Sequence, residues 1–327
     1  MVIDNATRTV FRAAAIALSA TLAGAAHAAL LAYDPFAYGS DPSAGEYALG
    51  DEDSGIGLIG GQNPVIGPTS FYAGPWIQSA GDTQVVKALP SLSYPALQAG
   101  VGGIQQETVQ FGCCTFGRSG REIDGGLGGG RSPRTIYQSF VIDFGSQGTD
   151  APDDFGFRGH ELWNGGVGDS FIAVQLFMNH FAGISTLSLK VETASSSSIE
   201  TVAEGLDLAT LAASNNGMHL VVMKYEFAAD AADVVSVYFD PATGIEPALA
   251  DAQISVAASD LFITHQGAFT NFTFSGSGHV PGAIDEIRWG DTYADVTPVP
   301  EPATLALFVM GLLALQRGAA RRRARAA

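Results

Sequence analysis

The chain has 327 residues, of which 46% are hydrophobic and 15% are charged, and its formal net charge is −17. This apolar fraction is sufficient to bury a core, so the composition excludes disorder as the overall state. Between residues 29 and 300, nine Lys and Arg stand against 31 Asp and Glu, a formal charge of −22. Binding to nucleic acid depends on neutralising phosphates with Lys and Arg, so this acidic segment argues against a nucleic-acid partner.

The N-terminus has the layout of a secretory signal peptide. Arg8 and Arg12 precede an alanine-rich apolar stretch over residues 13–23, and a small-x-small sequence follows at residues 26–28. These three parts, in this order, are typical of a signal peptide. We therefore expect residues 1–28 to be removed by cleavage between Ala28 and Ala29, and the protein to be exported. The alternative is a buried first helix of the domain.

Residues 29–298 are predicted to form one all-β domain. Ile136, Phe140 and Ile142 fall on one face of an alternating run, and Tyr137 and Ser139 fall on the other. Two alternating runs separated by a short polar turn predict a β-hairpin. The predicted strands are the hairpin over 221–227 and 235–239, and further runs at 171–178, 187–191, 261–265, 272–274 and 284–289. Many short strands without alternating helices indicate a β-sandwich or barrel.

Three segments of this domain lack a clear strand pattern. Residues 199–213 have some helical character, weakened by Gly205. Residues 37–68 and 112–133 are rich in glycine and low in apolar periodicity. We expect these two segments to form long loops or short edge strands.

The second half of the domain resembles the concanavalin A-like sandwiches of the laminin-G type. The residues that carry the resemblance are QSFVIDFG at 138–145, GHELWNGG at 159–166, HLVVMKYEF at 219–227 and the closing run AIDEIRWGDTYADVTP from 283 to 298. The resemblance covers about residues 134–298 and implies a jelly-roll of two sheets. The first hundred residues of the mature chain would supply the remaining strands. Sandwiches of this type include both lectin-like binders and glucanases.

The acidic residues do not form the pair that a glucanase needs. A retaining glycosidase places its nucleophile and its acid about 5 Å apart, for example on alternate residues of one strand. Glu122 and Asp124 begin such a pattern, but Gly125 and Gly126 follow where a second glutamate would stand. Asp285 and Glu286 are adjacent, so a regular strand directs them to opposite faces. We therefore expect no enzymatic activity, with a glycoside hydrolase as the alternative.

Aromatic residues suggest where a sugar could bind. A ring face can cover the apolar side of a pyranose while polar neighbours bind its hydroxyls. Trp163, with Asn164 and His160 close in sequence, is the predicted glycan contact, and Tyr72 with Trp76 is a second cluster. The alternative for both clusters is packing in the core.

The cysteines and a group of aspartates complete the candidate sites. Cys113 and Cys114 are the only cysteines and are adjacent. They could form a local disulfide, pair between molecules or remain thiols. Calcium is conceivable at Asp150, Asp153 and Asp154, although their spacing fits no EF-hand. Apart from this, the sequence predicts no metal site and no cofactor.

The C-terminus combines a short motif, an apolar run and arginines. The motif is VPEP, the apolar run spans 13 residues from Ala303 to Leu315, and five arginines lie between Arg317 and Arg325. A membrane helix needs about 20 residues, so the span must include residues 316–320, with Arg317 reaching the headgroups. Arginines after the span favour a cytoplasmic C-terminus. The alternative is a plain membrane anchor after a proline-rich linker.

These terminal features resemble the PEP-CTERM sorting signal of Gram-negative bacteria. The resemblance implies that Val299, Pro300, Glu301 and Pro302 are recognised by an exosortase, a membrane-embedded protease. The tail, residues 299–327, would hold the chain in the inner membrane until cleavage, after which the domain passes to the cell surface or the extracellular matrix. Two prolines keep this peptide extended, which suits its presentation to a protease.

The sequence as a whole favours a non-enzymatic exported surface or matrix protein. It is expected to be sorted through the PEP-CTERM signal and to bind the exopolysaccharide of a biofilm. The alternatives are a glycoside hydrolase of the same fold acting on extracellular glycan, and a purely structural matrix component without a small ligand.

Overall fold

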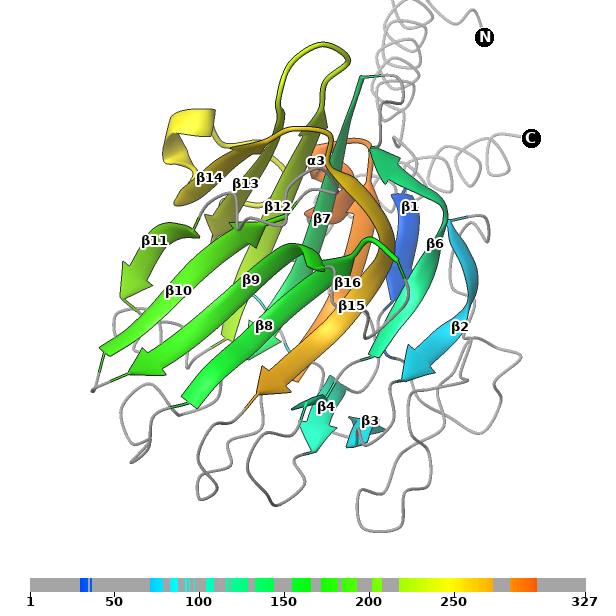
Figure 1. Cartoon of the computed structure of the whole chain (residues 1–327), viewed down its shortest axis with the longest axis vertical. Helices are drawn as coiled ribbons and strands as arrows, with labels where there is room; N and C mark the ends of the chain where they lie inside the picture. Colours follow the sequence, from blue (N-terminus) through cyan, green and yellow to red (C-terminus); the bar gives the residue numbers. More distant parts are fainter. Residues whose placement is uncertain are drawn as a thin grey trace, which may run out of the picture.

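The fold is a sandwich of two antiparallel β-sheets (Figure 1). The computed structural model describes residues 30–34, 36, 71–78, 83–87, 92, 94, 97, 104–108, 116–117, 119–128, 133–143, 155–165, 172–181, 184–192, 202–207, 218–272 and 283–298. The predicted all-β class is confirmed. Within the described residues, no helix is long and apolar enough to cross a membrane. The span predicted from Ala303 lies outside them.

The first sheet has the strand order β14-β13-β12-β7-β16-β4-β3, and β1 also pairs with β16. Its strands are β1 (Leu30–Asp34), β3 (Thr83–Lys87), β4 (Ile104–Thr108), β7 (Arg134–Asp143), β12 (Met218–Phe227), β13 (Asp233–Phe239), β14 (Ile254–Ala258) and β16 (Ala283–Gly290). The first and last described strands are therefore neighbours. The predicted hairpin is confirmed as β12 and β13, with Val221 opposite Phe239.

The second sheet has the order β11-β10-β9-β8-β15-β6-β2, with β5 beside β15. Its strands are β2 (Tyr72–Gln78), β5 (Phe116–Gly117), β6 (Ser119–Gly128), β8 (Phe155–Trp163), β9 (Ile172–Phe181), β10 (Ile184–Val191), β11 (Val202–Asp207) and β15 (Phe262–Phe272). The residues before 129 thus supply strands to both sheets, as expected.

Two local predictions are wrong. The segment 199–213, expected to have helical character, contains the strand β11, which pairs with β10 at the edge of the second sheet. The segment 112–133, expected to form a loop or a short edge strand, contains the ten-residue β6 between β15 and β2. Pairing on both sides satisfies the backbone of β6 despite its glycines, because a sheet supplies partners that local sequence does not reveal.

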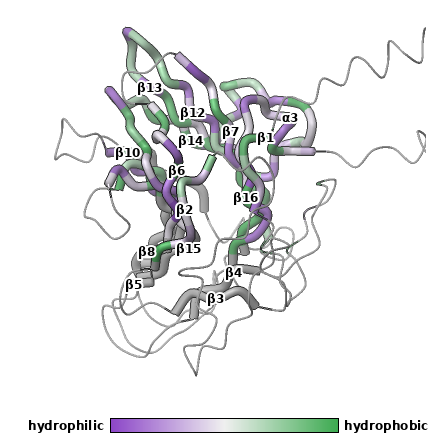
Figure 2. Tube along the Cα trace, turned by 90° about the vertical axis from the view of Figure 1, so that its right-hand side faces the viewer, coloured by the Kyte–Doolittle hydropathy of each residue, from purple (hydrophilic) through white to green (hydrophobic). Residues whose placement is uncertain are grey.

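The main hydrophobic core lies between the two sheets (Figure 2). Ile136, Phe140 and Ile142 of β7 belong to this core, as their alternation predicts. Ile287 and Trp289 of β16 also belong to it. Trp289 stacks on Tyr225 with ring centroids 5.7 Å apart.

Two polar bridges connect the sheets through this core. Gln266 of β15 accepts hydrogen bonds through Oε1 from the hydroxyl of Tyr72 at 2.5 Å and from Nε1 of Trp289. Arg121 of β6 pairs with Asp34 of β1 at 3.5 Å, and both side chains are buried. Buried polar groups need hydrogen-bond partners, and buried charges need a group of opposite charge. Because the partners here come from different sheets, these contacts favour one arrangement of the two sheets.

A second, smaller core covers the outer face of the first sheet. The short helix α3 (Tyr293–Val296) lies on this face, away from the second sheet (Figure 2). Its residues Tyr293 and Val296 pack with Tyr137, Val141 and neighbouring apolar residues. The end of the described chain is therefore fastened to the sandwich.

Candidate functional site

The junction between the fold and the C-terminal motif is tightly bonded. Ser139 of β7 donates to the backbone oxygen of Val296 at 2.6 Å. Thr297 donates through Oγ1 to the Tyr293 oxygen at 2.9 Å and accepts from the backbone N–H of Gly244 at 3.1 Å. Val296 and Thr297 are fully buried. The buried part of the fold thus extends to Thr297, and Pro298 is the last described residue.

An acidic, an imidazole and an indole side chain lie in a row across three neighbouring strands of the second sheet. His265 of β15 lies opposite Glu122 of β6 on one side and Trp163 of β8 on the other. Directly opposite residues of an antiparallel pair share a face. The next residues along, Leu162 and Gln266, are paired with each other and face the interior. The row Glu122–His265–Trp163 therefore lies on the side away from the first sheet.

A threonine organises the turn at the end of this row. Thr264 Oγ1 accepts a hydrogen bond from the N–H of Gly165 at 2.9 Å. Its hydroxyl hydrogen can be donated to the oxygen of Trp163 or of Gly165, both at 3.2 Å, and Nδ1 of His265 is 2.9 Å away. These contacts hold the half-buried Asn164 in a fixed turn beside the histidine.

The predicted glycan platform does not form at Trp163. Its side chain is 0% exposed, so neither ring face is available for a sugar to stack on. Trp76 of the second predicted cluster is also buried and packs near Phe36, with ring centroids 6.1 Å apart. His160 lies in β8, where its backbone pairs with that of Leu176, and its side chain is outside the described set. Trp76 therefore packs in the inter-sheet core, the alternative weighed for its cluster, whereas Trp163 is buried on the outer side of the second sheet.

The carboxylates differ sharply in their accessibility. Glu122 and Asp124 are both exposed, and alternate residues of β6 share a face. Asp285 and Glu286, in contrast, are fully buried. These two do not face opposite sides as predicted: Ile284 and Ile287 both belong to the inter-sheet core, and a bulge between Asp285 and Arg288 leaves the two acids between them on the outer side.

The bulge at Glu286 is a strained point of the first sheet. Glu286 has φ of 59°, a left-handed conformation that is unfavourable for a residue with a Cβ. Its Oε2 accepts hydrogen bonds from Arg288 at 2.5 Å and from the Tyr33 hydroxyl at 2.7 Å. The Arg288 guanidinium also lies 4.6 Å from the centre of the Tyr33 ring. This buried arrangement stabilises the strained bulge and leaves no carboxylate oxygen exposed to a substrate.

Asp285 has its own buried partners. Its Oδ2 accepts from the N–H of Leu92 at 2.9 Å, and its Oδ1 accepts from the N–H of Glu286 at 2.7 Å. Burial, followed by the neighbouring charge of Glu286, raises the pKa of Asp285 well above its usual range. Its contacts therefore give it a structural role, fastening Leu92 to the first sheet.

A histidine–aspartate pair was not found by sequence reasoning. Nδ1 of His219 lies 2.8 Å from Oδ2 of Asp240, and the histidine is fully buried. Asp240 has φ of 48° and accepts from the N–H of Leu220 at 3.1 Å. Burial and the nearby Asp240 raise the pKa of Tyr94 to about 12. No spacing motif joins His219 to Asp240, because β12 and β13 bring them together only on folding.

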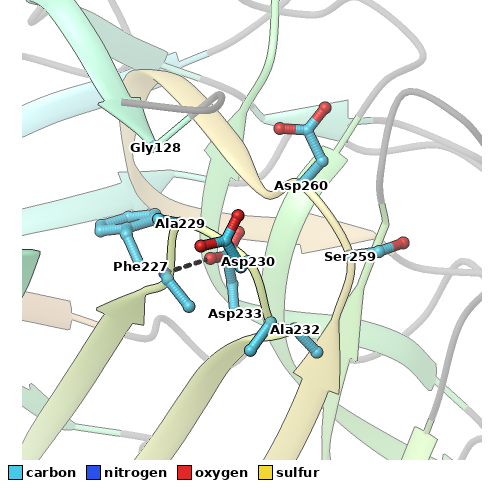
Figure 3. A pocket seen from close by; sticks show the side chains of 10 residues that line it. Gly128, Phe227, Ala229, Asp230, Ala232, Asp233, Ser259 and Asp260 are labelled. Atoms are coloured by element: carbon cyan, nitrogen blue, oxygen red, sulfur yellow. Dashed lines mark hydrogen bonds between the residues drawn. The ribbon is translucent and has the colours of Figure 1, made fainter. Parts of the chain in front are cut away.

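A pocket of about 430 Å³ lies at the turn between β12 and β13 (Figure 3). It is lined by Gly128, residues 227–233, Ser259 and Asp260. Asp233 is committed to the backbone, since it accepts from the N–H groups of Ala228 at 2.8 Å and Leu261 at 2.7 Å. In the described part of the chain, no group of three or more His, Cys, Asp or Glu side chains is arranged to hold a metal ion.

Several predicted sites lie outside the described residues. These are the cleavage site at Ala28 and Ala29, the vicinal pair Cys113 and Cys114, the aspartates at 150, 153 and 154, and the motif Val299, Pro300, Glu301 and Pro302. They remain predictions as far as the structure is concerned.

Comparison with solved structures found proteins of several kinds. The endo-β-1,4-glucuronan lyase of the fungus Trichoderma reesei is 13% identical, covers 70% of this chain and 96% of its own, and has a TM-score of 0.42. A legume lectin-like domain from Entamoeba histolytica is 10% identical, covers 66% and 90%, and has a TM-score of 0.37. The alginate lyase vAL-1 of Chlorella virus is 7% identical, covers 64% and 90%, and has a TM-score of 0.40. These similarities assign no activity to this chain.

Comparison of sequences gave one clear result, at the C-terminus. No curated protein matches the chain. A family model for the PEP-CTERM protein-sorting motif matches residues 298–323. This match begins at the residue after the last buried position of the fold, Thr297. The chain therefore ends in a PEP-CTERM sorting motif, the signal of an exported and sorted protein, joined directly to a two-sheet β-sandwich.

Proposed function

We propose that this protein is a non-enzymatic component of the cell surface or extracellular matrix, released from a membrane anchor by an exosortase. The observation that carries the proposal is the position of the sorting motif. All strands of both sheets lie before residue 291, and α3 closes the fold at Val296. Removal of the tail from Val299 onward would therefore take no described strand from the sandwich.

The N-terminal end of the fold supports the same proposal. β1 begins at Leu30, next to the predicted signal-peptide cleavage site, and pairs with the last strand, β16. The two ends of the described fold are thus joined to each other by a β-ladder. A domain built in this way keeps its sheets when both targeting segments are removed.

The proposed ligand is an extracellular polysaccharide. The outer face of the second sheet presents exposed Glu122 and Asp124 near His265, which are groups that can hydrogen-bond to sugar hydroxyls. The formal charge of −22 between residues 29 and 300 repels polyanions. We therefore propose a neutral glycan in preference to an acidic one, with saturable binding weakened by a Glu122→Ala/Asp124→Ala double substitution.

A glycoside hydrolase remains the second candidate. Glu122 and Asp124 share one exposed face of β6, which is a precondition for cooperation between two carboxylates, although Gly125 and Gly126 stand where a second glutamate would follow. Release of reducing sugar from β-glucans would support this activity if the Glu122→Gln substitution abolished it. Glycan binding without release of reducing sugar would support the non-enzymatic role.

The sorting step is tested by substituting the motif in the native host. Glu301→Ala is expected to leave the hydrophobic tail attached, which intact-mass spectrometry detects directly. Thr304→Ser, a conservative change just outside the four-residue motif, serves as the matched control and should be processed normally. If the wild-type tail is never removed, processing by an exosortase is wrong and permanent anchoring remains.

A further inference from the structure

The loop beside the sorting motif exposes two large aliphatic side chains. Among the described residues, the exposed large hydrophobic side chains are Ile245 at 74%, Leu249 at 54% and Ile77 at 44%. Two of these three therefore lie within five residues of each other. They belong to the connection between β13 and β14, which contains the short 3₁₀ helix η4 (Leu249–Asp251).

This loop is bonded to the segment that leads into the motif. The N–H of Gly244 donates to Thr297 Oγ1 at 3.1 Å, and the Tyr293 hydroxyl donates to the oxygen of Ala242 at 2.6 Å. Ile245 is thus the chain neighbour of a residue held against Thr297. These hydrogen bonds therefore hold the loop with the exposed aliphatic residues next to Thr297, the residue that precedes the matched sorting motif.

The charge beside Ile245 is already paired. Glu246 accepts a hydrogen bond from the Tyr137 hydroxyl at 2.8 Å, and its Oε1 lies 3.0 Å from Nζ of Lys224. The other residues from Ile245 to Ala250 are aliphatic, alanine or proline. Insertion of Ile245 and Leu249 therefore requires little additional desolvation of charge, with the exposed Asp251 that follows them remaining among the headgroups.

The length of the connection limits the distance from this loop to the membrane. Four residues lie between Pro298 and Ala303, where the predicted span begins, and a fully extended chain covers about 17 Å over these five residue-to-residue steps. While the tail is inserted, the bilayer surface is therefore close to Thr297. Because the tail already holds the domain at the bilayer, contact between the loop and the bilayer is effectively intramolecular. A weak apolar contact is then enough to keep the loop at the membrane surface.

We propose that Ile245 and Leu249 insert into the bilayer interface while the precursor is anchored by its tail. Transfer of an aliphatic side chain from water to the boundary between headgroups and acyl chains lowers the free energy of the system. This contact would orient the sandwich with the outer face of its first sheet towards the membrane. The inference rests on the proposed function, since it requires an inserted tail.

The experiment uses tryptophan as a depth probe in the full chain. The native residues Trp76, Trp163 and Trp289 are at most 1% exposed, so lipid quenchers should barely affect them. Ile245→Trp and Leu249→Trp are reconstituted into phosphatidylcholine vesicles whose acyl chains are brominated. Ile77→Trp, at the exposed position in β2 of the other sheet, is the matched control.

The expected result is that both loop variants are quenched at least about twofold more strongly than Ile77→Trp. Flotation of the same vesicles measures tail insertion independently, and circular dichroism measures folding. Flotation with equal quenching at all three positions would overturn the loop contact and leave the anchor intact. Failure of the folded chain to float would overturn both the anchor and the contact that depends on it.

Discussion

Asp233 fastens the β12–β13 turn to the start of β15. Asp233 is 4% exposed, and its carboxylate accepts two backbone hydrogen bonds, from Ala228 at 2.8 Å and from Leu261 at 2.7 Å. A hydrogen bond to a charged group contributes about 1.5–3 kcal/mol. Asp233→Ala is therefore expected to lower the free energy of unfolding by about 3–5 kcal/mol, since it removes both acceptors.

The assay is equilibrium unfolding in urea, followed by fluorescence of the three buried tryptophans. Asp233→Asn retains one acceptor oxygen and should cost about half as much as the alanine variant. Asp230→Ala lies in the same turn, where the side chain is exposed, and is expected to change stability by less than about 0.5 kcal/mol. Equal losses for Asp230→Ala and Asp233→Ala would refute the role of the two hydrogen bonds.

Three further predictions concern buried positions. Gly128 has φ of 79°, and a Cβ there would collide with the Leu261 oxygen. Gly128→Ala should therefore lower the free energy of unfolding by at least about 2 kcal/mol in the same urea assay. The control Gly74→Ala should be tolerated, because a Cβ at Gly74 meets nothing within 4 Å. Because the pKa of Asp285 is raised on folding, its contribution to stability decreases as pH rises above the unfolded value of about 4. Asp285→Asn should remove this decrease, and a pH-independent difference from wild type would contradict the reasoning. Arg288→Met leaves Glu286 buried without its cation and should cost about 3–5 kcal/mol in thermal or urea unfolding; a loss below about 1 kcal/mol would show that the pair is dispensable.

The strands of the inter-sheet core were predictable because alternation is a local property. Ile136, Phe140 and Ile142 stand two or four residues apart, so one face of β7 could be assigned from spacing alone. Ile287 and Trp289 of β16, which also stand two residues apart, lie together in the same core. The C-terminal sorting motif was also recognisable, because its residues are consecutive in the sequence.

The candidate site residues were less predictable, because their environment depends on distant segments. Trp163 has polar neighbours in the sequence that suit a sugar platform, yet its side chain is fully buried in the folded chain. Asp285 and Glu286 were expected on opposite faces, but one extra residue in the bulge changes the register and brings both to the outer side. A bulge is a property of strand pairing and has no signature in either strand alone.

Long-range pairing also explains the strands that were missed. β6 has four glycines among its ten residues, so its own propensity is low. Its place between β15 and β2 nevertheless makes it a central strand. The His219–Asp240 pair and the contact between Gly244 and Thr297 arise in the same way. Local periodicity and the linear sorting motif at the C-terminal end could be read in advance. Burial, bulges and the bonded junction before the sorting motif instead follow from which strands meet, because the free energy of those contacts is gained only when both sheets form.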